Sequence, residues 1–154
     1  MLAYLSFGSN VGDRVEHLRS GVAIVAGTDP YRLSRVYETE PVGGVAQDDF
    51  WNLVMELVTE VSPWALLERA QRAEAQRHRT RDVRWGPRTL DVDVLWVEGF
   101  TSDDPRLTVP HPRAMERAFV VAPWRELAPE LISESDVERA VGRVVALDTL
   151  EMLQ

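Results

Sequence analysis

Residues 84–93 have the sequence RWGPRTLDVD, and the segment continues as VLWV to Val97. From Leu90 onward, two sets of positions alternate with the period of a β-strand, so Asp91 and Asp93 are expected on the same face. Such positions lie roughly 7 Å apart at the backbone, and their carboxylates could share Mg²⁺ ions about 3.5–4 Å apart. From this strand alone, the solvent-exposed face of a half-buried strand is an equally good interpretation.

An arginine cluster precedes the strand. Positions 77–88 hold five arginines and one acid, Asp82, for a net charge of +4 in a chain of net charge −8. Arginine binds phosphate oxygens in a bidentate manner, so the cluster indicates local phosphate binding and not a general polyanion surface. The alternative is a solvated basic helix face, but Gly86-Pro87 would end such a helix before Arg88.

Composition limits the possible classes of protein. The 154 residues, 45% hydrophobic and 27% charged, fit one domain over 1–154. Neither a membrane-length apolar run nor a leader pattern is present, so we expect a cytoplasmic protein without a membrane partner. The chain has no cysteine and no lysine, which excludes thiolate metal sites, Schiff-base chemistry and lysine-dependent phosphate loops.

The hydrophobic pattern predicts alternating strands and helices. The expected elements are a strand at 2–7, a helix from Asp13 to Gly27, a strand at 31–39, a strand at 50–60 and a helix from Ser62-Pro63. After the 90–97 strand we expect a polar loop at 98–105, an extended piece at 106–109, a helix at 113–122 ended by Pro123, and a short helix with a capping box at 135–138. This order favours an α+β ferredoxin-like sandwich, with helices on one face of a mostly antiparallel sheet and the site on the open face.

Two further positions suggest ligand binding. Phe50 and Asn52 are expected on one face of their strand, where an aromatic ring beside an amide suits a planar heterocycle. An edge aromatic beside a turn asparagine is as good an interpretation. His111 is held between two prolines at a predicted helix start, a good position for meeting phosphate, although a lone histidine is more often structural.

The 84–93 motif, together with LTVPHPR at 107–113 and ERAF at 116–119, resembles the hydroxymethyl-dihydropterin pyrophosphokinase family of the folate pathway. The resemblance runs from Gly8-Ser9-Asn10 to residues 128–131. It implies a ferredoxin-like fold and a monomeric enzyme. It also implies Mg²⁺-dependent transfer of pyrophosphate from ATP to the hydroxymethyl group of 6-hydroxymethyl-7,8-dihydropterin, with release of AMP.

Matching positions imply roles for individual residues. The resemblance implies that Asp91 and Asp93 bind two Mg²⁺ ions. It also implies that the catalytic residues are Arg79, Arg88, Asp91 and Asp93. The residues it assigns to ATP are Gln71, Glu74, Arg79, Arg81, Arg88, Arg106, Thr108, His111 and Arg117. The residues it assigns to the pterin are Thr39, Val42, Phe50, Asn52, Trp85 and Phe119, with the ring stacked between the two phenylalanines. The segment between Arg81 and Trp85 is one residue shorter than in some relatives, so either Arg81 or Arg84 could be the second loop arginine.

Other interpretations are weaker. A nucleotidyltransferase would also use Gly8-Ser9 and an Asp-x-Asp pair, but these lie more than eighty residues apart here. An RNA-binding module is disfavoured because the chain is acidic and lacks a basic-aromatic strand, so no nucleic-acid partner is expected. Asp93 is the nearest candidate for a general base. Segments 42–49 and 79–88 are expected to act as lids.

Overall fold

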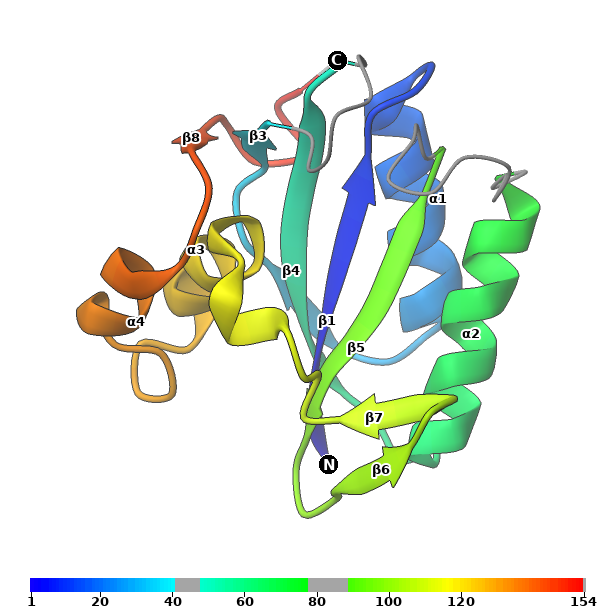
Figure 1. Ribbon diagram of the computed structural model, residues 1–154. Coiled ribbons are helices and arrows are strands. Elements are labelled where there is room, and N and C mark those ends of the chain that lie inside the picture. Colours follow the sequence, from blue (N-terminus) through cyan, green and yellow to red (C-terminus); the bar gives the residue numbers. More distant parts are fainter. Residues whose placement is uncertain (41–47, 78–88, 154) are drawn as a thin grey trace.

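The computed structural model describes residues 1–40, 48–77 and 89–153 (Figure 1). The first part of the chain forms β1 (Leu2–Ser9), α1 (Arg14–Ala26), β2 (Tyr31–Leu33), β3 (Tyr37–Thr39), β4 (Phe50–Val58), α2 (Pro63–Gln76) and β5 (Asp91–Val97). The second part forms β6 (Ser102–Asp104), β7 (Leu107–Val109), a 3-10 turn (Ala114–Glu116), α3 (Ala118–Leu127), α4 (Glu134–Arg139) and β8 (Val144–Ala146). The predicted α+β class is confirmed.

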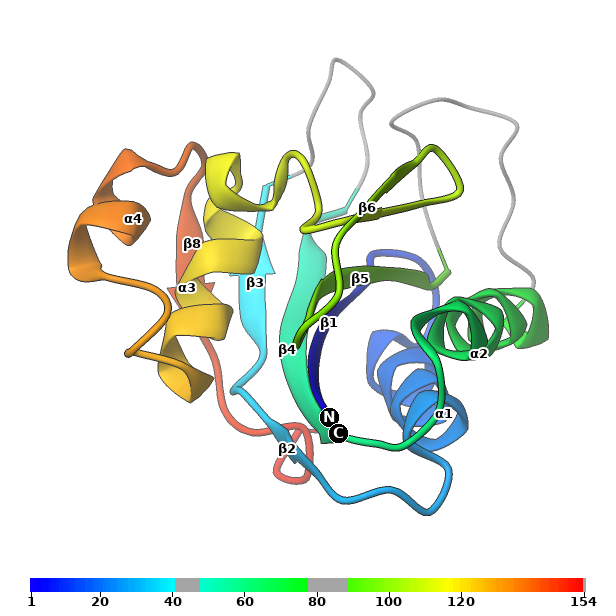
Figure 2. The ribbon, with the colours of Figure 1, turned by 90° about the horizontal axis from the view of Figure 1, so that it is seen from below.

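One sheet organises the molecule. Its strand order is β5-β1-β4-β3-β8, with β2 also paired to β4, and all of these pairings are antiparallel (Figure 2). The strands β6 and β7 form a separate hairpin. The long central strands β1 and β4 lie between β5 at one edge and β8 at the other, so residues far apart in sequence meet on each face.

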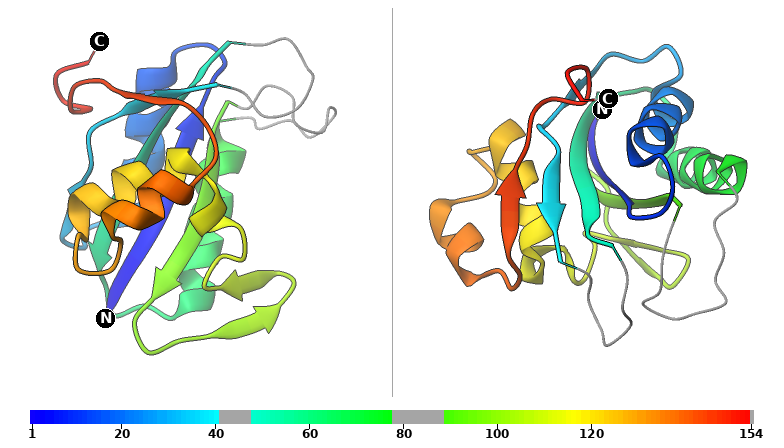
Figure 3. Two further views of the ribbon diagram at one scale, coloured as in Figure 1. Left: turned by 60° about the vertical axis from the view of Figure 1, so that its left-hand side comes forward. Right: turned by 90° about the horizontal axis from the view of Figure 1, so that it is seen from above.

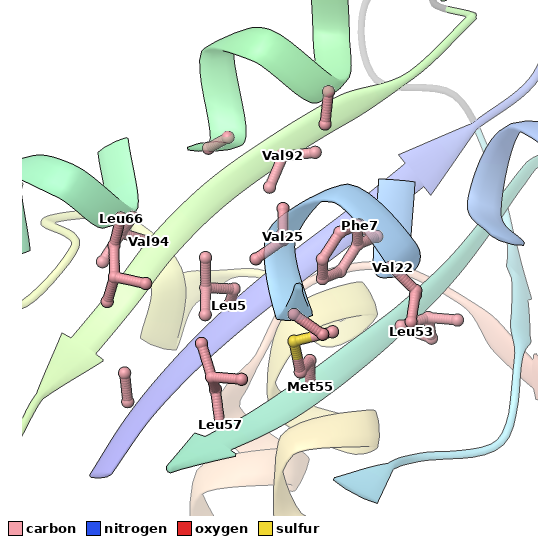
Figure 4. Close-up of a cluster of buried hydrophobic side chains, with 14 of the residues drawn as sticks. Leu5, Phe7, Val22, Val25, Leu53, Met55, Leu57, Leu66, Val92 and Val94 are labelled. Carbon is pink, nitrogen blue, oxygen red and sulfur yellow. The ribbon is translucent and has the colours of Figure 1, made fainter. Parts of the chain in front are cut away.

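The helices α1 and α2 cover one face of this sheet and enclose the larger core. Leu5, Leu53 and Met55 are fully buried there against helix residues such as Val25 and Leu66 (Figure 4). Local signals place α1 as predicted. Asp13 caps its N-terminus by accepting from the Glu16 N–H, and Gly27 follows its last residue with a φ of 57°.

The opposite face is shared between a second core and an open area. Tyr4, Val54 and Leu95 pack against α3, where Val121 and Trp124 are buried. We expected the helices on one face of the sheet; α1 and α2 lie there, whereas α3 and α4 lie on the other face (Figure 3). The open area of this face lies near the end of β1, at Ser6 and Gly8.

Two strand predictions need correction. Residues 31–39 form two strands because Ser34 interrupts the ladder, with its side-chain oxygen accepting from the Val54 N–H. In β5, a register shift opposite Tyr4 and Leu5 inserts Leu95 as an extra residue. As a result Trp96 packs on the α3 side and Val97 in the larger core, contrary to the strict alternation that we predicted.

The second half of the chain also differs from expectation. The predicted polar loop at 98–105 contains β6, because the chain folds back as the β6–β7 hairpin. The predicted helix at 113–122 is a 3-10 turn followed by α3, separated by the extended Arg117. That helix continues past Pro123, since burial of Trp124 and Leu127 compensates for the one hydrogen bond that proline removes.

The last helix begins two residues earlier than predicted. Its capping box joins Ser133 and Asp136, and α4 starts at Glu134 instead of after Ser135. The strand β8 was not predicted at all. None of the helices in the described parts of the chain is long and apolar enough to cross a bilayer.

Candidate active site

A cavity of about 840 Å³ opens on the sheet face opposite α1 and α2. Strands β1, β3, β4 and β5 form its floor, and the segment from His111 to Phe119 and the chain after α4 form its walls. The lining residues are Ser6, Phe7, Gly8, Thr39, Glu40, Phe50, Asn52, Asp91, Asp93, His111, Arg113, Met115, Glu116, Arg117, Phe119, Arg139 and Val141. Eight residues predicted for the site are among them: Thr39, Phe50, Asn52, Asp91, Asp93, His111, Arg117 and Phe119.

Strand register sets the distance between the acidic and the amide side chains. Gly8 pairs with Asp91 on one side and with Asn52 on the other, so the three residues form one row across β5, β1 and β4. Neighbouring strands lie about 4.8 Å apart, which separates the outer two backbones by roughly 10 Å. Because Gly8 has no side chain, the Asn52 amide can lie close to the β1 backbone in the middle of this row.

Gly8 is itself required by the geometry. A Cβ atom built on it would lie 2.5 Å from Asn52 Oδ1 and 3.6 Å from the Phe50 ring. From the sequence alone, Gly8 enters only as the start of the family resemblance and in the weaker nucleotidyltransferase interpretation, and it is not assigned to the site. The strand register, which no local pattern reveals, makes it the floor of the cavity.

The carboxylates lie at the β5 side of the cavity. Asp91 and Asp93 are half-buried and project from the same face, as the alternation predicted. Two carboxylates beside room for a polyphosphate form a donor set that fits Mg²⁺, which is usually held by one or two protein carboxylates plus substrate oxygens. The described residues contain no group of three or more His, Cys, Asp or Glu side chains suited to a metal, so oxygen atoms from substrate and water would have to complete the coordination.

A hydrogen bond to Glu74 on α2 holds the backbone of edge strand β5 in place. The N–H of Val92, between the two aspartates, donates to Glu74 Oε2 at 3.0 Å, and Glu74 is buried on α2. This bond satisfies a backbone donor that an edge strand would otherwise leave without a partner. Glu74 therefore lies outside the cavity, where it fixes the backbone of the aspartate pair.

His111 is a neutral hydrogen-bond donor at the cavity wall. The ring Nδ1 accepts from the backbone N–H of Arg113 at 3.2 Å, which leaves the ring proton on Nε2. The backbone N–H of His111 donates to the Leu95 carbonyl. Burial lowers the pKa of His111 below its ordinary value, and nearby Arg117 lowers it further while Asp91 acts in the opposite sense. A neutral imidazole with Nε2–H can donate to a phosphate oxygen.

The opposite side of the cavity is aromatic. Phe50 on β4 and Phe119 at the start of α3 both line it. Asn52, which also lines the cavity, donates from Nδ2 to Thr39 Oγ1 at 2.7 Å. Arg117 lies over the Phe119 ring, 5.6 Å from its centroid. This side of the cavity therefore combines two aromatic rings with an amide, side chains that suit a planar ligand.

Besides Glu74, three predicted nucleotide residues are not brought to the cavity. Gln71 is exposed on α2. Arg106 lies on the β6–β7 hairpin, where it pairs with Asp104 and covers the Trp64 ring. Thr108 donates its hydroxyl to the Asp104 carbonyl on the same hairpin.

Five predicted site residues lie outside the described part of the chain: Val42, Arg79, Arg81, Trp85 and Arg88. Arg84, the alternative loop arginine, and most of the two predicted lids also lie there. Arg77, the first arginine of the cluster, is described, and its Nε donates to His17 Nδ1 at 2.8 Å.

Sequence reasoning missed several lining residues besides Gly8. Once it is known that Leu5 and Phe7 face α1, the alternation of β1 places Ser6 on the cavity side. Arg113, Met115 and Glu116 are within the 113–122 segment, but the break at Arg117 sets which of them face the cavity. Arg139 and Val141 come from the end of the chain, and no sequence signal placed them here.

Comparison with known proteins agrees with this geometry. The family described as 7,8-dihydro-6-hydroxymethylpterin-pyrophosphokinase matches residues 4–129. Relatives named 2-amino-4-hydroxy-6-hydroxymethyldihydropteridine pyrophosphokinase include one from Bacillus subtilis, 42% identical over 137 residues that cover 87% of this chain and 82% of the relative. One from Methylorubrum extorquens is 42% identical over 140 residues, 89% of each chain. One from Haemophilus influenzae is 37% identical over 133 residues, 84% of this chain and 83% of the relative. The chain therefore belongs to the 7,8-dihydro-6-hydroxymethylpterin-pyrophosphokinase family.

Proposed function

We propose that this protein transfers the pyrophosphoryl group of ATP to the hydroxymethyl group of 6-hydroxymethyl-7,8-dihydropterin and releases AMP, a step of tetrahydrofolate biosynthesis. The observation that carries the proposal is the row across β5, β1 and β4. Asp91 and Asn52 stand at the two ends of this row, on either side of the Gly8 backbone, and both line one cavity together with Asp93.

The acceptor binds at the aromatic side. Its planar ring stacks between Phe50 and Phe119, and the amide of Asn52, which can both donate and accept, pairs with the ring edge. Asn52 and Thr39 bond to each other in the structure, so binding exchanges one hydrogen bond for others without leaving a buried amide unsatisfied. The hydroxymethyl arm then points across Gly8 toward β5.

The triphosphate binds at the β5 side. His111 donates from Nε2 to a phosphate oxygen, and Arg117 supplies positive charge at the same wall. Asp91 and Asp93 would hold Mg²⁺, with two ions expected from the family resemblance. When bound there, Mg²⁺ would neutralise phosphate charge.

The reaction forms a bond between the pterin hydroxyl oxygen and the β-phosphorus. The bond from that phosphorus to the oxygen bridging it to the α-phosphorus breaks, and AMP leaves with that oxygen. The hydroxyl proton passes to solvent or to Asp93, the carboxylate we propose as its nearest acceptor. The main contribution of the protein is positioning, because reacting atoms must approach to about 3–3.5 Å.

The nucleotide product tests the proposal. The protein is incubated with ATP, Mg²⁺ and the hydroxymethyl-dihydropterin, and the mixture is separated by chromatography. We expect AMP and a pterin carrying two phosphates in equal amounts. ADP as the main nucleotide would indicate an ordinary kinase, and free pyrophosphate a nucleotidyltransferase; either result, without AMP, would overturn the proposal.

A further inference from the structure

The end of the chain contributes to the cavity although it lies outside the family match. The match stops at residue 129, whereas Arg139 and Val141 line the cavity wall. Figure 3 shows the chain after α4 returning to the sheet beside β3, where it forms β8. This segment is therefore a part of the site that lies beyond the residues matched by the family model.

The backbone at Val141 is fixed on both sides. The Val141 N–H donates to the Glu116 carbonyl at 2.8 Å, and the Ala118 N–H donates to the Val141 carbonyl at 3.0 Å. Gly142 follows with a φ of 120°, a conformation that other residues rarely adopt. Because these bonds tie Val141 to the residue before Phe119, the wall moves with the ring-binding side of the cavity.

The side chain of Val141 is largely exposed, although two hydrogen bonds hold its backbone in place. It is 78% exposed, and Met115, another apolar residue of the cavity wall, is 42% exposed. Val145, four residues later on β8, is 49% exposed but does not line the cavity. An exposed apolar side chain on a rigid rim gains free energy when a ligand covers it.

Sheet order decides which ligand can cover Val141. The carboxylates lie on β5 at one edge, and β8 lies at the other, where Val144 pairs with Thr39. Val141 is thus on the side of Thr39 and Phe119, away from Asp91 and Asp93. A ligand group that reaches it belongs to the acceptor ring and not to the polyphosphate.

We infer that Val141 is a specificity-determining residue for the acceptor: its side chain covers the outer edge of the bound ring and keeps water from the hydrogen bonds that Asn52 and Thr39 make to that ring. This inference rests on the proposed function and names a residue that acts on the acceptor alone. It predicts that changes at Val141 alter the KM for the pterin and leave the KM for ATP unchanged.

Two substitutions and a matched control test it. Val141→Ala removes apolar surface, and Val141→Thr keeps the shape but adds a hydroxyl. Val145→Ala makes the first change on the same segment outside the cavity. We expect Val141→Ala to raise the pterin KM about fivefold, Val141→Thr to raise it in the same direction, and Val145→Ala to leave it within twofold of the original protein.

Equilibrium titration of each variant with the pterin and a non-hydrolysable ATP analogue gives a second readout. The pterin Kd should rise in parallel with its KM, while circular dichroism spectra stay superimposable. Unchanged pterin KM and Kd in the folded Val141→Thr protein, or equal shifts for pterin and ATP, would overturn the inference. If the unmodified protein binds pterin but forms no AMP, the proposed function fails, and the Kd comparison still decides the role of Val141.

Discussion

The two faces of the sheet are built in different ways. On the face under α1 and α2, each strand supplies apolar residues at alternate positions, and the core needs only that they be buried together. On the other face, the cavity collects residues from six separate parts of the chain, and their value depends on relative position. Substitutions in the core under α1 and α2 should therefore change stability, whereas substitutions among the cavity residues should change catalysis.

The largest effect is expected at the aspartate pair. Asp91→Asn and Asp93→Asn remove the charge that we propose holds Mg²⁺, so each should lower kcat by at least about a hundredfold. The melting temperature should change little, because both side chains are only half-buried. Steady-state kinetics and thermal melts measure both quantities, with Asp103→Asn on the exposed hairpin as the control. High activity in both variants would refute the metal assignment.

A core substitution should show the opposite behaviour. Leu53 is fully buried under α1, and Leu53→Ala should lower the free energy of unfolding by about 2–5 kcal/mol. The protein that remains folded should keep its kcat, since Leu53 faces away from the cavity. Urea unfolding measures the loss, and Val58→Ala, at a half-exposed position of the same strand, should lose much less. Equal losses at the two positions would contradict the packing described here.

Gly8 lies on β1 in the floor of the cavity, and its substitution should affect the pterin but not ATP. The added Cβ of Gly8→Ala must displace Asn52 Oδ1, since the two would lie 2.5 Å apart. We expect kcat/KM for the pterin to fall about tenfold, which corresponds to about 1.4 kcal/mol, with the KM for ATP unchanged.

A double-mutant cycle supplies the control for Gly8. In an Asn52→Ala background, where no amide remains to be displaced, Gly8→Ala should have little additional effect on the pterin. Fully additive losses would show that Gly8 acts through something other than Asn52.

The smallest effect is expected at His17 on α1. Burial lowers the pKa of His17, and Arg77, whose Nε donates to it, lowers it further. The unfolded chain then binds a proton more readily than the folded one, so stability is lost as the pH falls through the ordinary histidine pKa of about 6.5. His17→Gln should reduce the drop in melting temperature between pH 7.5 and 5.5. The same drop in both proteins would show that His17 does not contribute to it.

Much of this protein could be predicted from local patterns. Asp13 and Gly27 bound α1, Ser62-Pro63 begins α2, and alternation puts Phe50 and Asn52 on one face of β4, all as the structure has them. The shared face of Asp91 and Asp93 was predicted in the same way. These predictions succeed because capping, helix periodicity and strand alternation depend on residues within a few positions of one another.

The sequence by itself therefore determined α1 and α2, the shared face of Phe50 and Asn52, the shared face of Asp91 and Asp93, and the resemblance to the family that the comparisons show. Tertiary structure alone decided that Gly8 separates Asp91 from Asn52, that Glu74 on α2 bonds to the β5 backbone, and that Val141 lines the cavity. These relations depend on strand register, on a bulge at Leu95 and on the return of the chain end to β3. Each is fixed by contacts between residues far apart in the sequence, where no local periodicity records them.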